Sequence, residues 1–85
     1  IPAYGFFVRH VRGLEMNNVE LRYMKDELRP AFLLNDVKGS VFRFVKAQHA
    51  PDVPTFVLKD VEDFSTHQSS LPDTKLAVVK GKKTL

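Results

Sequence analysis

The feature that most constrains this chain is a repeat of 24 to 26 residues. Three segments align without a gap: residues 6–13, 32–39 and 56–63. Each begins with Phe and two apolar residues, continues with two polar or charged residues, and then has Val followed by a charged residue. Such a repeat predicts that one supersecondary unit is used three times, so that neighbouring units cover one another's apolar side chains.

Within each unit the apolar residues recur at steps of two, with an occasional step of three. A step of two keeps side chains on one face of a strand, whereas a step of three marks a corner at which one extra residue turns the chain. Helices would need recurrences at three and four, and the Val, Phe and Leu content also favours strands. Strands are therefore expected near residues 5–10, 14–17, 19–23, 31–36, 40–43, 45–48, 55–60 and 64–67.

Glycine, asparagine and proline fall between these strands or at their ends. Gly13 and Gly39 fit corners that need a positive φ, and Asn18 can adopt the same left-handed conformation. The five prolines lie in the expected loops or near the chain ends, where a missing N–H does least harm to a sheet. The longer loops are expected at residues 24–30 and 49–54.

Stacking the units would give an all-β solenoid. Phe6, Phe32 and Phe56 would then lie on top of one another, and burial of each ring would contribute roughly 1.5–3 kcal/mol. Two further columns are expected from Val8, Leu34 and Leu58 and from Val11, Val37 and Val61. The expected organisation is three coils, at residues 5–30, 31–54 and 55–70, followed by an irregular C-terminal tail or cap at residues 71–85.

The alternative architecture is an antiparallel β domain of three hairpins. It would use similar strands and turns, but it would not require the spacing of 24 to 26 residues between the units. The two architectures differ in whether Phe6, Phe32 and Phe56 are neighbours.

The composition excludes several classes of site. The chain has no cysteine, so it has no disulfide, no cysteine zinc site and no thiol nucleophile. Its histidines, His10, His49 and His67, are scattered, and we expect neither a metal nor a cofactor. The longest apolar run is four residues, which is too short to span a bilayer.

The net charge of +3 comes from the C-terminal end of the chain. Four lysines lie in the last twelve residues, which contain no acid, and nine basic and ten acidic side chains remain elsewhere. The body of the chain is therefore near neutral, whereas nucleic-acid binding usually needs a basic stripe on a folded face. We expect no nucleic acid and no membrane as partners, and we interpret the lysines as a frayed, solvated terminus.

The first residues carry no secretion signal. The chain starts Ile1-Pro2-Ala3-Tyr4, without the charged and apolar regions of a signal peptide. This internal-looking start favours a fragment or a processed product.

Three stretches carry a resemblance to a known family: residues 29–32, 46–58 and 71–76. Together with the coil length, the inward columns and the one-residue corners, they resemble the right-handed parallel β-helix of the pectate-lyase-like superfamily. More narrowly, the whole chain is similar to the C-terminal coils of bacterial family 28 glycoside hydrolases, the polygalacturonase and rhamnogalacturonase group. The most specific stretch is Lys46-Ala47-Gln48-His49-Ala50.

The resemblance implies a parent protein that hydrolyses galacturonan-type glycosidic bonds with inversion. One aspartate would act as general acid and another as the base for a water. The family's Asn-Thr-Asp, Asp-Asp, His-Gly and Arg-Ile-Lys motifs are absent from this sequence. We therefore assign no catalytic residue here and expect this part alone to be inactive. The parent would be extracellular or periplasmic, and the implied partners are its upstream coils and an acidic polysaccharide.

Four residues are candidates for binding that polysaccharide. Arg9 and Lys59 lie on outward positions of the first strand of their coils, with Asn35 at the equivalent position between them, and such groups bind carboxylates by charge-assisted hydrogen bonds. Arg29 and His49 lie in loops that could reach toward a cleft. A structural role is the alternative for both.

Asp36 and Asp60 occupy equivalent positions, together with His10. We interpret the two aspartates as corner residues that hydrogen-bond turn backbone, in preference to catalytic carboxylates.

Phe7, Leu33 and Val57 form an outward apolar strip. The strip could stack on a sugar, or it could be covered by residues 76–79 of the tail; we favour the cover, because aliphatic side chains bind sugars poorly.

Three functions compete at this stage. The first is the non-catalytic, C-terminal end of a pectin-type polysaccharide hydrolase, which would close the solenoid. The second is a non-catalytic β-helix that serves as a carbohydrate-binding or surface adhesin module. The third is a free-standing small binding domain.

Overall fold

The computed structural model describes residues 3–23 and 28–85, and this part of the chain contains strands and no helix. The expected all-β fold is therefore confirmed. The strands are β1 (Phe6–Asn17), β2 (Glu20–Leu21), β3 (Phe32–Arg43), β4 (Lys46–Ala47), β5 (Phe56–His67) and β6 (Thr74–Thr84). The loop expected at residues 24–30 lies partly outside the described residues.

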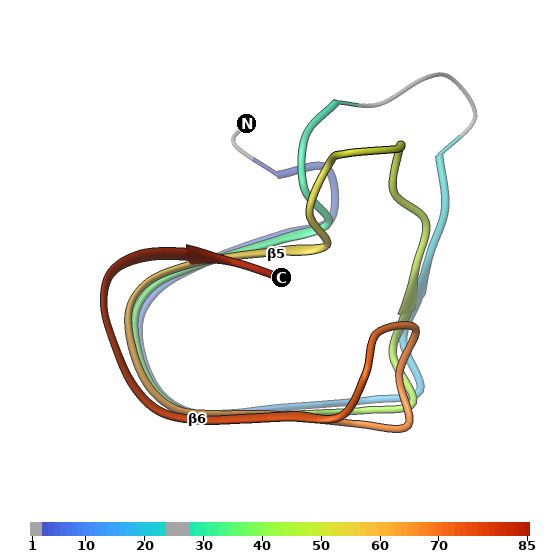
Figure 1. Cartoon of the computed structure of the whole chain (residues 1–85). Helices are drawn as coiled ribbons and strands as arrows, with labels where there is room; N and C mark the ends of the chain where they lie inside the picture. The colour runs from blue at the N-terminus through green and yellow to red at the C-terminus, as the bar shows by residue number, and fades with distance from the viewer. Residues whose placement is uncertain (1–2, 24–27) are drawn as a thin grey trace.

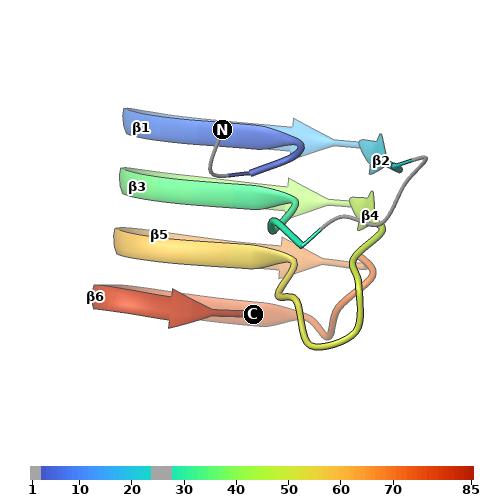
Figure 2. The ribbon, with the colours of Figure 1, turned by 90° about the horizontal axis from the view of Figure 1, so that it is seen from above.

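The long strands form one sheet in the order β1-β3-β5-β6, and β2 and β4 form a small second sheet. β1, β3 and β5 are mutually parallel, whereas β6 runs antiparallel to β5. Figure 1 looks along the stack, so that the three parallel strands overlie one another. Figure 2 shows the four long strands one beneath the next, and we call each of them a rung.

The register of the parallel rungs follows the sequence repeat. Phe6 pairs with Phe32, and Phe32 pairs with Phe56. Their rings stack with centroids 5.6 and 4.8 Å apart and interplanar angles of 9° and 12°. The predicted column of phenylalanines is therefore confirmed, and the antiparallel three-hairpin alternative is wrong because these rungs pair in parallel. The two predicted columns of Val and Leu pair in the same register.

Each parallel rung is bent, and the bend depends on residues in the left-handed region. Gly13 and Gly39 have φ values of 74° and 80°, as predicted, and Asn18 has a φ of 56°. His10, Asp36 and Asp60 form a second set, with φ between 53° and 57°.

The expected pairs of short strands, such as 5–10 and 14–17, are therefore single bent strands. The ladder continues through the corner because every rung turns at the same register position.

The core lies on the inner side of the bent rungs and is densely aromatic. Phe32, Phe42, Phe56 and Phe64 are fully buried. Phe42 makes edge-on contacts with Phe32 and Phe56, at centroid distances of 5.4 and 5.0 Å. Such contacts add to the free energy gained from area burial alone.

The C-terminal segment is a strand, and the expectation of an irregular, frayed tail is wrong. In β6, Val79 lies opposite Val61 and Leu76 lies opposite Phe64. Beyond β6, the carbonyl oxygen of Leu85 accepts hydrogen bonds from the N–H groups of Thr55 and Phe56. The unpaired edge of β5 provides the hydrogen-bonding partners that order this lysine-rich segment.

The expected cover of the outward apolar strip is also wrong. β6 lies beside β5 in the sheet and does not lie over the strip. Phe7 remains 43% exposed, whereas Val57, which pairs with Thr84 of β6, is 8% exposed. The strip therefore presents one accessible ring.

The aromatic core predicts a large difference between two Phe→Ala substitutions. Phe56→Ala removes a fully buried ring that contacts three others, and should lower the free energy of unfolding by about 3–5 kcal/mol. Phe7→Ala, the matched control on the outer face, should change it by no more than about 1 kcal/mol. Urea unfolding followed by circular dichroism measures the free energy of unfolding of both variants. Equal losses of stability would contradict the placement of Phe56 in the core and of Phe7 on the outer face.

The corner predicts a position-specific cost for a β-carbon. At Gly39, φ is +80° and an added β-carbon would lie 3.7 Å from the backbone nitrogen of Gly13. Since the space is adequate, the effect of Gly39→Ala comes from the positive φ, which alanine adopts unfavourably. The substitution should lower the free energy of unfolding by about 1–2 kcal/mol. The neighbouring Lys38→Ala should cost less than about 0.5 kcal/mol, because it loses only an exposed ion pair with Glu62. Comparable unfolding midpoints for the two variants would refute this account.

Candidate functional site

The outer face of the sheet carries a column of cations, one on each of three rungs. Arg9 pairs in register with Asn35, Asn35 with Lys59, and Lys59 with Lys82. Neighbouring strands lie about 4.8 Å apart, so the column follows the stacking direction. We call Arg9, Asn35, Lys59 and Lys82 the cation column.

The cation column is free of ion pairs within the described part of the chain. The ion pairs found there join other residues, among them Lys38 with Glu62 and Arg43 with Glu15. The guanidinium of Arg9 lies over the ring of Phe7, 5.7 Å from its centroid. Arg9, Lys59 and Lys82 are exposed, so their charges are available to an anionic ligand.

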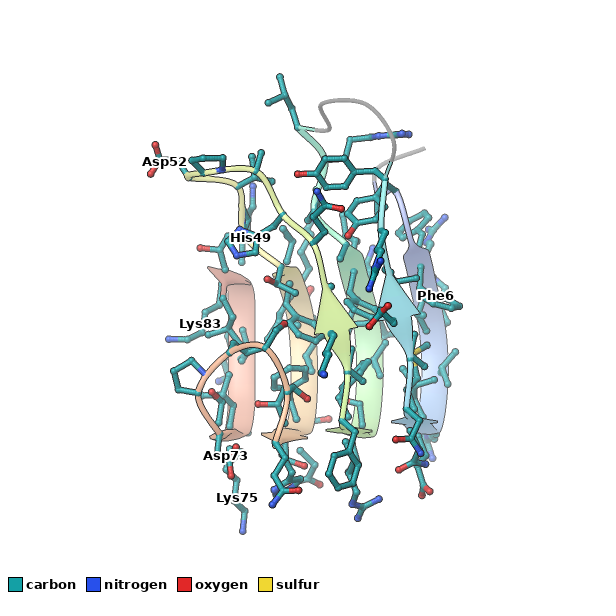
Figure 3. The ribbon with its side chains drawn as sticks, turned by 90° about the vertical axis from the view of Figure 1, so that its right-hand side faces the viewer. Phe6, His49, Asp52, Asp73, Lys75 and Lys83 are labelled. Atoms are coloured by element: carbon teal, nitrogen blue, oxygen red, sulfur yellow. The ribbon has the colours of Figure 1, made fainter. Side chains whose placement is uncertain are left out.

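The structure brings together only two of the four predicted binding residues. Arg9 and Lys59 lie in the cation column, as their repeat positions predicted. Arg29 is an exposed loop residue that precedes β3, outside the column. His49 lies in the loop after β4 (Figure 3), where its Nδ1 is 3.1 Å from the carbonyl oxygen of Ala50.

Lys82 is the member of the cation column that sequence reasoning missed. It belongs to β6, which contains no copy of the repeat and was expected to be irregular. The available signal was the step of three from Leu76 to Val79, which is the step that marks a corner in the repeated units. Figure 3 shows the neighbouring Lys83 pointing away from the other rungs.

The second column lies at the corner of the rungs. The Nδ1 of His10 and the Oδ2 of Asp36 are 2.7 Å apart, and Asp60 accepts a hydrogen bond from the N–H of Gly81. The expected corner role of both aspartates is confirmed by their positive φ. Asp60 bonds to backbone as predicted, whereas Asp36 bonds to a side chain instead.

These contacts tie adjacent rungs together. The hydrogen bond with His10 lowers the pKa of Asp36 below its ordinary value. Desolvation opposes this shift, and electrostatic interactions with His10, Lys38 and Arg12 add to it. The carboxylate of Asp36 is thus engaged in holding β3 to β1.

The lowered pKa of Asp36 predicts a pH-dependent contribution to stability. A carboxyl group with a depressed pKa in the folded state stabilises that state above its unfolded pKa, and the contribution is lost as the pH falls through the folded pKa. Asp36→Asn should therefore be less stable than the parent sequence at neutral pH, and the difference should shrink as the pH falls below the ordinary value of 3.8. Asparagine also tolerates the left-handed conformation.

Urea unfolding of both proteins between neutral pH and pH values below 3.8 measures this difference. A difference that stays constant across the series would contradict the assignment. Asp73→Asn is a matched control for the effect of removing a carboxylate elsewhere.

Two kinds of feature are absent from residues 3–23 and 28–85. This part of the chain contains no group of three or more His, Asp or Glu side chains that could hold a metal ion. It also contains no helix of the length and apolarity that crossing a membrane requires.

Comparison of the chain with protein-family models, with curated proteins and with solved structures finds no match in any of the three. Its function is therefore proposed from the chain's own sequence and geometry.

Proposed function

We propose that these residues form the C-terminal, non-catalytic end of a secreted polysaccharide hydrolase built on a right-handed parallel β-helix. The observation that supports this most directly is the difference between the two ends of the stack. β6 covers one end with an antiparallel strand, whereas at the other end no strand of the described residues pairs with the outer edge of β1. A unit of this kind would terminate a longer stack of parallel rungs.

The end formed by β6 is unsuited to further pairing. Exposed lysines occur along β6 at positions 75, 80, 82 and 83. Lysine on an edge strand discourages pairing with another strand, because the charge would have to be desolvated or placed beside like charges. This end therefore protects β5 and presents a charged edge to solvent.

The end formed by β1 has the opposite character. Phe6 packs on Phe32 with one face and remains 38% exposed, whereas Phe32 and Phe56 are fully buried. The inward residues Val8, Leu14 and Met16 are only partly buried. A preceding coil in the same register would complete their burial, so upstream coils of a parent chain are the proposed partners.

The parent is proposed to hydrolyse galacturonan-type glycosidic bonds outside the bacterial cytoplasm. This step rests on the resemblance of residues 29–32, 46–58 and 71–76 to family 28 glycoside hydrolases. The catalytic aspartates would lie on the coils that precede this unit. Arg9 and Lys59 of the cation column would attract the carboxylates of an acidic polysaccharide; Arg29 and His49 do not join them.

The cation column also favours a second candidate, a non-catalytic β-helix that binds carbohydrate or serves as a surface adhesin. The charge of Arg9 lies over the exposed ring of Phe7, and an aromatic ring with a nearby cation suits an anionic sugar. This candidate needs no catalytic coils upstream.

Extension of the chain upstream tests the proposal. The chain with its native preceding coils should unfold at higher urea concentration than the chain alone, because β1 gains a second neighbour. The extended protein should release reducing sugar from polygalacturonate, and the 85-residue chain should release none. Extended coils without paired aspartates on outward positions, together with no hydrolysis, would favour the binding module instead.

A further inference from the structure

Each parallel rung ends at a further corner, where the chain leaves the long strand (Figure 2); we call it the exit corner. Its residues are Asn18 after β1, Phe44 after β3 and Gln68 after β5, with φ values of 56°, 54° and 49°. The N–H of Asn18 donates to the carbonyl oxygen of Arg43 at 3.0 Å. The N–H of Phe44 donates in the same way to His67 on the next rung, also at 3.0 Å. The ladder therefore continues through the exit corner and fixes its backbone.

Phe44 is an unusual residue for this position. Asparagine adopts a positive φ more readily than most residues, whereas a bulky side chain in that region is an outlier. Phe44 is also 49% exposed, and none of the ring-stacking or cation–π contacts within residues 3–23 and 28–85 involves it. Packing therefore offsets the conformational cost only in part. Strained residues of this kind cluster at ligand-binding sites, which is a reason to look for a ligand here.

The ring of Phe44 borders a shallow hollow of about 300 Å³ on the outside of the stack. The residues that line the hollow are Asn18, Val19, Glu20, Phe44 and Lys46. Glu20 and Lys46 are register partners on β2 and β4, so one acid and one base lie side by side. The lining thus combines an aromatic ring with polar side chains and carries no net charge.

The polar side chains of the hollow offer both kinds of hydrogen-bonding group. The amide of Asn18 donates and accepts, the ammonium of Lys46 donates, and the carboxylate of Glu20 accepts. One oxygen of Glu20 lies 2.8 Å from the guanidinium of Arg22, and a carboxylate has capacity for further bonds. Hydroxyl groups also donate and accept, so neighbouring hydroxyls of a sugar suit this set. A carboxylated sugar would bring its charge close to that of Glu20.

We propose that Phe44 and this hollow bind a neutral pyranose sugar of the glucose type, stacked on the phenylalanine ring. Equatorial hydroxyls leave the C–H bonds of the sugar axial, so that its faces are apolar. The weakly positive hydrogens of such a face fit the negative face of an aromatic ring. The hydroxyls at the rim of the sugar would then bond to Asn18, Glu20 and Lys46. An apolar contact with a few placed polar groups is the usual composition of a small-ligand site.

This site is separate from the cation column. Arg9 and Lys59 precede the first corner of their rungs, whereas Phe44 follows the last residue of β3. The cation column suits an acidic sugar, and the hollow at the exit corner suits a neutral one. The inference needs neither upstream coils nor catalysis. Hydrolysis of polygalacturonate by the extended protein therefore tests the proposed function without testing the exit corner.

Titration of the isotope-labelled 85-residue chain with cellotetraose, a linear β-linked glucose oligosaccharide, tests the site by amide NMR. Concentration-dependent shifts are expected at residues 17–20 and 43–46, and not at the cation column. Tetragalacturonate, which carries a carboxylate on every unit, is the matched ligand and should bind more weakly at the exit corner.

Phe44→Asn separates binding from folding, because Asn18 occupies the same corner position on the neighbouring rung with nearly the same φ. The variant should unfold at higher urea concentration than the unsubstituted chain, since asparagine tolerates this conformation better. Its affinity for cellotetraose should fall by about tenfold or more, because the stacking ring is lost. Val78→Ala is the matched control: it trims another exposed apolar side chain, on β6, and should leave that affinity unchanged.

Four results would each overturn the inference. They are the absence of shifts with cellotetraose, shifts centred on the cation column, an unchanged affinity of Phe44→Asn, and equal binding of tetragalacturonate at the exit corner. A lower urea midpoint for Phe44→Asn would also count against it, because the argument requires that phenylalanine is held there at a cost in stability.

Discussion

The parallel hydrogen-bond ladder between β1, β3 and β5 is the constraint on which the rest of the structure depends. Paired strands can bend together only if each bends at the same register position, so the corner has to be built three times. The first corner position is occupied by His10, Asp36 and Asp60, all with positive φ. Aspartate visits this region at a lower cost than most residues, and its carboxylate can bond to the adjacent rung.

The ladder also explains why distant residues form columns. Residues that are 24 to 26 positions apart are held about one strand spacing from each other. On the inner face this spacing brings aromatic rings into stacking distance, and on the outer face it aligns Arg9 with Lys59. The core and the cation column are therefore two consequences of one register, on opposite faces of the same strands.

The repeat in the sequence was sufficient to predict the stacking of the parallel rungs and one of their two corner positions. The recurrence of Phe at positions 6, 32 and 56 specified the stacking, and Gly13 and Gly39 specified one corner. It did not show that hydrogen bonding continues through the corner, because a step of three in the apolar pattern is the same for two short strands and for one bent strand.

Tertiary effects account for the remaining differences from expectation. β6 contains no copy of the repeat, and its strand conformation depends on the free edge of β5, in keeping with the strong context dependence of strand formation. Among the binding candidates, Arg9 and Lys59 were placed correctly because the register fixes strand residues. Arg29 and His49 lie in loops, where no repeated ladder sets their positions.

The two ends of the stack also differ in how much each rung gains from its neighbours. In a stacked array an internal rung is stabilised by two interfaces, whereas a terminal rung has one. The exposure of the phenylalanine column follows this rule, since Phe6 is 38% exposed and the rings on β3 and β5 are buried. β6 gives β5 its second interface without repeating the motif, because it pairs antiparallel to β5 with a register shift between Lys59 and Val61. β1 lies at the edge of the sheet and has only β3 as a neighbour among the described strands, so its phenylalanine is the exposed end of the column.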